Sequence, residues 1–526
     1  MITSRRTVVG GVTGPGGYRR LATGPAEPHQ PRTELAAAPE KTEDARPLLA
    51  LAQLSDIHVC DSLSPVRAEF LDRWVDPDSP ARELIGEIGT YRAQEILTAQ
   101  VVDAMVRAIN AVDVGPVSGR PLDLAIATGD NTDNCQANEL RRYLALLHGG
   151  PVHPDSGDLT RYEGVSDETE FDERFWHPES AELDLPRDRY GFPAVPGLLD
   201  AARAPFEAAG LRLPWLAVHG NHDQLLQGNT PGNPLLARLA VGSRKPIGLP
   251  AELSSPQAVG ELIGGLARCD PRALSRLVRA HVRTVSPDPG RRIINTAEFV
   301  AAHDGPRARP ARHGFGADGL PYYRHDHVTA DAVITMLVLD TVNPHGNWQG
   351  SIDPTQLDWL RDQLSDADRD KRYVVLCGHH PLNDLINGIA GEDAPPRVLR
   401  DELAEALAGH PSLVCSLNGH THATAITPHD DWWELTAPSL IDWPQQGRIV
   451  ELTRCRGTLT IATTMVDHAG PAPWTGGLDG PETLAGLSRE LAANDWQSRH
   501  HRLDLHPSAG RPTDRNALLY LTDPWA

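Results

Sequence analysis

The sequence contains few lysines and few cysteines, and it lacks both an excess of positive charge and any long apolar segment. Only Lys41, Lys245 and Lys371 among its 49 basic residues are lysines, and the formal net charge is −21. Binding to nucleic acid through a broad basic surface depends on Lys and Arg contacts with phosphates, so the charge argues against that class. No segment approaches the about 20 apolar residues of a membrane-spanning helix. We therefore expect neither a nucleic-acid surface nor a membrane span.

The six cysteines are scattered along 526 residues and form no CxxC pair. In so long a chain this pattern predicts reduced thiols, which favours a cytoplasmic location. The alternative is export, because Ser4-Arg5-Arg6 begins like a twin-arginine signal. However, the residues that follow are rich in Gly and Pro and do not provide the apolar stretch of about 7–15 residues that a signal needs.

Six apolar stretches of strand-like length end in polar residues, and helical patterns lie between them. Their first residues are Leu48, Leu122, Leu213, Val333, Tyr373 and Ser412. In the helical pattern after Asp353, a predicted N-cap, Leu357, Leu360 and Leu364 share one face. This alternation predicts an α/β fold. Ligands in such folds bind beyond the carboxyl ends of the strands, so we expect these polar ends to converge.

Two segments interrupt the alternation, the acidic residues 149–196 and the mixed helical and loop residues 224–331. Both follow strand ends, so we interpret them as insertions around a site in one catalytic domain, residues 47–465. A separate small helical domain is the alternative for residues 224–331. Residues 1–46 are expected to form a flexible arm, and residues 466–526 a C-terminal extension that packs on the domain.

The polar residues at the strand ends form a set of nitrogen and oxygen donors. They are Asp56, His58, Asp130, Asn221, His222, His379, His420 and His422. Carboxylate, imidazole and amide donors suit a divalent ion such as manganese, iron, zinc or cobalt. The set exceeds the four ligands of one tetrahedral zinc and therefore indicates two ions. Two ions about 3.5–4 Å apart can activate a hydroxide and bind the oxygens of a substrate during in-line displacement.

The order of these motifs, DxH, GD, GNHD, GHH and GHTH, resembles that of the calcineurin-like metallophosphoesterase superfamily. The resemblance extends from about Leu48 to Met465 without the insertions. The stretch from Val338 to Leu364 is similar to the cyclic-nucleotide and glycerophosphodiester phosphodiesterase branch, and the long inserts to a bacterial long-insert subgroup. The resemblance implies a four-layer α/β/β/α sandwich and hydrolysis of a phosphoester, either a small phosphodiester or a phosphomonoester.

The resemblance also implies a role for each residue. Asp56, His58 and His422 hold a first ion, Asn221, His379 and His420 hold a second, and Asp130 bridges them. His222 is not a ligand in this pattern, but faces the substrate and protonates the leaving oxygen or stabilises the transition state. Asp223 orients His222. Asp133 stands where the purple acid branch has an iron-binding tyrosine, which argues against a tyrosinate–iron site.

Two other functions stay open at this point. A metal-stabilised binding or scaffold protein without catalysis would have the same fold, although the intact ligand set and His222 argue against it. A dinuclear amidohydrolase or lactamase-type enzyme is disfavoured because HxHxDH and HExxH motifs are absent. The sequence does not determine the identity of the metals, the choice between monoester and diester, or the oligomeric state.

Overall fold

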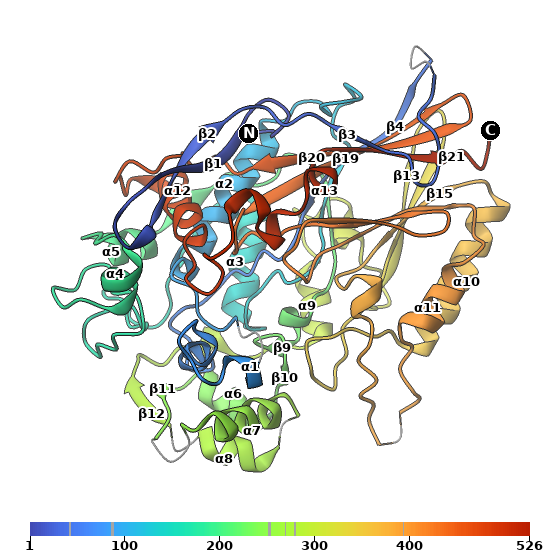
Figure 1. Cartoon of the computed structure of the whole chain (residues 1–526). Coiled ribbons are helices and arrows are strands. Elements are labelled where there is room, and N and C mark those ends of the chain that lie inside the picture. Colours follow the sequence, from blue (N-terminus) through green and yellow to red (C-terminus); the bar gives the residue numbers. More distant parts are fainter. Residues whose placement is uncertain (41–43, 86–88, 251–253, 269, 278–279, 393) are drawn as a thin grey trace.

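The computed structural model describes residues 1–526 except residues 41–43, 86–88, 251–253, 269, 278–279 and 393. At its centre are two β-sheets with helices on both sides (Figure 1). In the seven-stranded sheet, β4, β5 and β8 run parallel to one another. Beside them, β19 is antiparallel to β4, β20 is antiparallel to β19, and β21 is antiparallel to β20. In spatial order its strands are β3 (Gln30–Arg32), β21 (Ala517–Thr522), β20 (Thr458–Asp467), β19 (Gln446–Cys455), β4 (Arg46–Leu54), β5 (Leu124–Ala127) and β8 (Trp215–Ala217).

The six-stranded sheet has four parallel strands in the middle and an antiparallel strand at each edge. In spatial order its strands are β13 (Tyr323–Val328), β14 (Val333–Val338), β15 (Tyr373–Cys377), β16 (Leu413–Asn418), β18 (Trp433–Thr436) and β17 (Ala425–Pro428). All six stretches that the sequence analysis predicts as strands belong to these two sheets.

Alternating side chains of β14 explain the layered architecture, because successive residues of a strand point to opposite faces. Ile334 and Met336 lie in the core that includes residues of the seven-stranded sheet, whereas Leu337 lies in a second core with α10 (Pro354–Arg369) and α11 (Arg400–Leu407). The predicted N-cap Asp353 accepts a hydrogen bond from Thr355 N at 2.8 Å.

On the side away from α10 and α11, the helices α2 (Thr98–Asn110) and α3 (Ala137–His148) cover the seven-stranded sheet, and α12 (Gly480–Ala492) packs against α2 (Figure 1). The order of layers is therefore helix, sheet, sheet, helix, which confirms the predicted α/β/β/α fold class.

The insertions form small elements outside the sheets. The first contains β6 (Gly150–Val152) and α4 (Leu185–Tyr190), and α5 (Leu198–Arg203) and β7 (Phe206–Ala208) follow it. The second contains β9 (Leu225–Leu226), β10 (Thr230–Pro231), α6 (Pro234–Ala240), β11 (Arg244–Gly248), α7 (Pro256–Ala267), α8 (Pro271–Leu277), β12 (His281–Thr284) and α9 (Thr296–Ala302). The predicted end of this insertion at residue 331 is too late, because β13 already pairs with β14 in the six-stranded sheet.

The N-terminal segment differs from the flexible arm predicted for residues 1–46. β1 (Thr7–Thr13) and β2 (Arg19–Gly24) form an antiparallel hairpin, and β3 pairs with β21 at the edge of the seven-stranded sheet. The α-amino group donates a hydrogen bond to Asp467 O at 2.6 Å. Without β3, the outer side of β21 would have unpaired backbone groups. The polar residues of β3 pair with them, because backbone hydrogen bonds do not require apolar side chains. β21 likewise places the end of the C-terminal extension inside the same sheet.

Cys60, Cys135, Cys377 and Cys415 are free thiols, as expected, and Cys269 lies outside the described residues. Among the helices that the structure describes, none has the length and apolar character required to cross a membrane.

Candidate metal centre

The predicted metal ligands all follow strands whose carboxyl ends lie at the interface of the two sheets. Asp56 and His58 follow β4, Asp130 follows β5, and Asn221 follows β8 of the seven-stranded sheet. From the six-stranded sheet, His379 follows β15, and His420 and His422 follow β16. Parallel strands deliver their ends to one edge, so residues up to 366 positions apart in the sequence become neighbours.

The first group consists of Asp56, His58 and His422, whose ligand atoms lie within 4.8 Å of one another. His58 Nε2 is 3.1 Å from His422 Nε2, and His422 Nε2 is 3.4 Å from Asp56 Oδ1. Burial, together with the charge of His222, lowers the pKa of His58 to about 4, which keeps this imidazole neutral with a free lone pair. The group could therefore offer two nitrogens and a carboxylate to one ion.

The second ion is predicted to be held by His379, His420 and Asn221, of which His379 and His420 lie with His380 in one group whose ligand atoms are within 4.8 Å of one another. His420 Nδ1 is 3.3 Å from His379 Nε2. The Asn221 Nδ2 group donates to Gly228 O at 3.1 Å, while the buried Asn221 Oδ1 has no hydrogen-bond partner among the described residues. A buried carbonyl oxygen without a donor is costly, and a metal ion would satisfy it. These residues therefore fit the second ion.

Asp130 lies between the two groups. Its Oδ2 is 3.7 Å from His58 Nε2 and 3.2 Å from His379 Nε2, and its Oδ1 accepts a hydrogen bond from His222 N at 2.8 Å. Burial alone would raise the pKa of Asp130, but His379 and His222 hold it well below its usual range. A charged carboxylate within reach of both groups is what a bridging ligand requires.

Five of the predicted ligands have left-handed backbone conformations, which non-glycine residues seldom adopt. The φ angles are 48° for Asp56, 45° for His58, 50° for Asp130, 69° for His420 and 54° for His422. Such conformations cost about 1–3 kcal/mol each and cluster at functional sites, where surrounding structure imposes them. The strain therefore supports a functional role for these loops.

Gly419 lets the GHTH loop approach the first strand end. A Cβ at this position would collide with Ser55 Oγ and Asp56 Oδ2. We expect Gly419→Ala to displace Asp56, to reduce metal binding and to destabilise the protein by about 1–3 kcal/mol, as overpacking does. Urea unfolding measures the change in stability.

The control is Gly260→Ala in α7, where an added Cβ meets no atom within 4 Å. This change is expected to stabilise the protein by up to about 1 kcal/mol, since alanine restricts the unfolded chain. Equal stability of Gly419→Ala and the wild type would contradict the crowding at the GHTH loop.

His222 lies beside the two groups with its side chain partly exposed. Its Nδ1 donates to the backbone carbonyl of Asp133 at 2.6 Å, and its Nε2 is 4.0 Å from Asp130 Oδ2. With Nδ1 committed to the carbonyl, Nε2 is the nitrogen that can exchange a proton with a bound molecule.

The role predicted for Asp223 needs correction, because the Asp133 carbonyl and not the Asp223 carboxylate orients the His222 ring. The Asp223 carboxylate accepts hydrogen bonds from the backbone N–H groups of Asn131, Thr132 and Gly220 at 2.9–3.3 Å. The Asp223 carboxylate therefore connects the loop after β5, which carries Asp130, to the loop after β8, which carries Asn221.

His379, and not its neighbour His380, presents a free nitrogen to the centre. His379 Nδ1 donates to Thr128 O at 2.9 Å, which leaves Nε2 directed toward Asp130. Both nitrogens of His380 have other partners, since Nδ1 is 2.7 Å from Thr341 Oγ1 and Nε2 is 2.9 Å from Trp348 O. His219, outside the predicted set, is buried and lies 3.1 Å from Asp340 Oδ1.

Two carboxylates behind the first group were not identified from the sequence as partners of its histidines. Asp442 Oδ2 accepts a hydrogen bond from His422 Nδ1 at 2.6 Å and is also bound by Arg92. Asp133 Oδ1 is 3.4 Å from His58 Nδ1, longer than an ordinary hydrogen bond. Carboxylates in this position orient a ligand imidazole and strengthen its binding to a metal. The second Asp of GDNTDN is a local signal for Asp133, but Asp442 follows no recognisable pattern.

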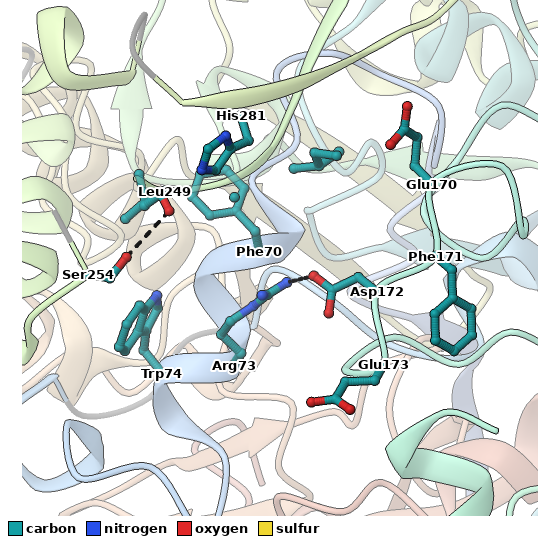
Figure 2. A pocket seen from close by; sticks show the side chains of 12 residues that line it. Phe70, Arg73, Trp74, Glu170, Phe171, Asp172, Glu173, Leu249, Ser254 and His281 are labelled. Carbon is teal, nitrogen blue, oxygen red and sulfur yellow. Dashed lines mark hydrogen bonds and ion pairs between the residues drawn. The ribbon is translucent and has the colours of Figure 1, made fainter. Parts of the chain in front are cut away.

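A cavity of about 530 Å³ lies apart from these ligands, between the segment Glu69–Val75 and the two insertions. Figure 2 shows Leu249, Ser254 and Trp74 on one side and Glu170, Phe171 and Glu173 on the other, with the ion pair between Arg73 and Asp172 in the middle. The two charged groups of this pair are 2.6 Å apart. Its lining residues are distinct from the predicted metal ligands.

Comparisons with known proteins find only distant likenesses. No protein-family model matches the chain, and no curated protein has a sequence similar enough to report. Among solved structures, a dimetal phosphatase from Danio rerio is 13% identical, with 80% of this chain and 99% of that chain covered and a TM-score of 0.33. A Staphylococcus aureus protein described as a 5'-nucleotidase, in complex with alpha-ketoglutarate, is 10% identical, with 83% and 57% covered and a TM-score of 0.31. A protein described as the anchor in the inner membrane complex of Plasmodium is also 10% identical, with 82% and 87% covered and a TM-score of 0.28. Likenesses this weak carry no conclusion about the site, whose chemistry rests on its own side chains.

Proposed function

We propose that the protein is a dinuclear metal-dependent hydrolase of phosphoesters. The observation that carries this proposal is the convergence of two adjacent groups of nitrogen and oxygen donors that share Asp130. His222 lies beside the shared carboxylate without belonging to the proposed ligand set. Together these features supply the ligands and the proton-exchanging group of a two-metal hydrolase.

Two bound divalent ions would supply a nucleophilic hydroxide and neutralise charge on the phosphoryl oxygens. Asp56, His58 and His422 would hold the first ion, Asn221, His379 and His420 would hold the second, and Asp130 would be shared between them. His222, fixed through Nδ1 by the Asp133 carbonyl, holds or gives a proton at Nε2 as the alcohol departs. The phosphoester class is what the resemblance to the calcineurin-like metallophosphoesterase superfamily implies.

The substrate is proposed to be a small phosphodiester or phosphomonoester. With a net charge of −21, the protein repels long polyanions, whereas a single phosphate group is attracted locally by the ions. The metals are proposed to be divalent manganese, iron or zinc, which accept mixed nitrogen and oxygen ligands.

The test is hydrolysis of an aryl phosphate ester by the full chain with added manganese, followed by a panel of phosphomonoesters, cyclic nucleotides and glycerophosphodiesters. Activity is expected to disappear with EDTA and to return with manganese. Stoichiometric binding of manganese without turnover of any ester would overturn the proposal in favour of a silent scaffold protein.

A further inference from the structure

A buried lysine connects the second insertion to the segment that follows the first metal-binding loop. Lys245 of β11 is fully buried, and its Nζ donates to Glu69 Oε1 at 2.6 Å. It also donates to the backbone carbonyls of Ser62 and Ser64, at 3.3 and 2.9 Å. Lys245 therefore fixes β11 to the residues that continue from the DxH loop.

From Glu69 a series of buried ion pairs continues to the metal centre. Glu69 Oε1 is 3.4 Å from Arg67 Nε, and Arg67 forms an ion pair with Asp133. Asp133 Oδ1 is 3.4 Å from Nδ1 of the predicted ligand His58. Cations and anions thus alternate from Lys245 through Glu69 and Arg67 to Asp133, and the series ends at the neutral imidazole of His58. We name these five residues the charge path.

The charge path is shielded from solvent, because each of its side chains is at most 4% exposed. Water cannot compensate a charge removed from such a series, so the remaining groups must rearrange or lose stability. Arg67 also binds Glu95, at 2.9 Å, so three carboxylates share one guanidinium. Lys245 neutralises Glu69 and leaves Arg67 available to Asp133.

We propose that Lys245 is a positioning residue for His58, so that the second insertion sets the affinity of the first metal ion. Asp133, held by Arg67, favours the His58 tautomer with its proton on Nδ1 and its lone pair on Nε2. Nε2 is the atom that faces His422 at 3.1 Å. This inference rests on the proposed metal centre and adds a residue from outside the motifs to it.

The neighbouring strand provides a matched control. Lys245 is paired across β11 and β12 with Arg283, another buried cation. Arg283 forms an ion pair with Asp167 of the first insertion at 2.7 Å and has no place in the charge path. Loss of either cation disturbs the same pair of strands, but only Lys245 is connected to His58 through the charge path.

The experiment measures binding of manganese to the full chain, without substrate, by titration calorimetry and electron paramagnetic resonance. Lys245→Met is expected to weaken the first ion by about tenfold, the lower end of the effect of residues that orient ligands. Arg283→Met is expected to leave both affinities unchanged. The double variant Lys245→Met/Glu69→Gln should restore the affinity, because Glu69 then no longer competes for Arg67.

Wild-type affinity in a folded Lys245→Met variant, or an equal loss in Arg283→Met, would overturn the inference. If Lys245→Met does not fold, Asp133→Asn tests the other end of the charge path, and unchanged manganese binding there overturns it too. A wild-type protein that binds no manganese would instead refute the proposed function. The two failures are therefore distinguishable.

Discussion

Replacement of His222 by alanine is expected to lower kcat by about 100- to 10,000-fold, the range typical of a lost general acid. Both ions should remain bound, because the His222 ring bonds the Asp133 carbonyl and the proposed ligand set does not include it. The backbone N–H of His222, which donates to Asp130, is retained in the variant. The measurements are steady-state kinetics with an aryl phosphate ester and metal content after dialysis.

Asn221→Ala provides the contrasting control. Asn221 contributes Oδ1 to the proposed second ion, so its loss should weaken metal binding, and added manganese should recover part of the activity. Added manganese should not rescue His222→Ala. Loss of an ion from His222→Ala, or recovery of its activity by excess metal, would contradict the division of roles between these adjacent residues.

Metal affinity is expected to depend steeply on pH. Burial alone would lower the pKa of His379, but Asp130 and Asp56 raise it to about 9. Burial would also lower the pKa of His422, but the hydrogen bonds to Asp442 and Asp56 raise it to about 10. Below these values both metal-free rings hold a proton that a metal ion must displace.

Metal binding that releases protons becomes stronger as the pH rises, so the affinity for manganese should increase with pH. Each ion displaces one proton, His422 releasing it to the first ion and His379 to the second, so the apparent affinity for each manganese ion should rise by up to about tenfold per pH unit between about pH 6 and 8. His58, with its lowered pKa, contributes no proton in this range. Calorimetry in buffers of different ionisation enthalpy measures the protons directly.

The variant Asp442→Asn distinguishes the contribution of His422 to the pH dependence from that of His379, because it removes one of the carboxylates that hold the proton on His422. The pH dependence of the affinity for the first ion should then fall below tenfold per pH unit, while that for the second ion, which depends on His379, should not change. An affinity that does not change with pH in the wild type would show that these rings are already deprotonated without metal.

The sequence by itself predicted an α/β fold and the donor residues at the strand ends, because both depend on local patterns, whereas the four-layer arrangement and the assignment of donors to two ions were implied by the resemblance. Apolar stretches of strand length predicted β4, β5, β8, β14, β15 and β16, and polar residues directly after them marked the edge where parallel strands meet. The alternation of strands and helices likewise predicted α10, with its N-cap at Asp353. These signals need no knowledge of distant contacts.

Only the tertiary structure decided which residues stand behind the ligands and how the additional segments join the domain. Asp442 reaches His422, Asp223 joins two loops instead of orienting His222, and Lys245 connects an insertion to the residues beside His58. The N-terminal segment supplies the edge strand β3, which pairs with β21 from the other end of the chain. Each of these contacts depends on the packing of segments far apart in sequence, because a charged side chain carries no local sign of which buried partner will neutralise it.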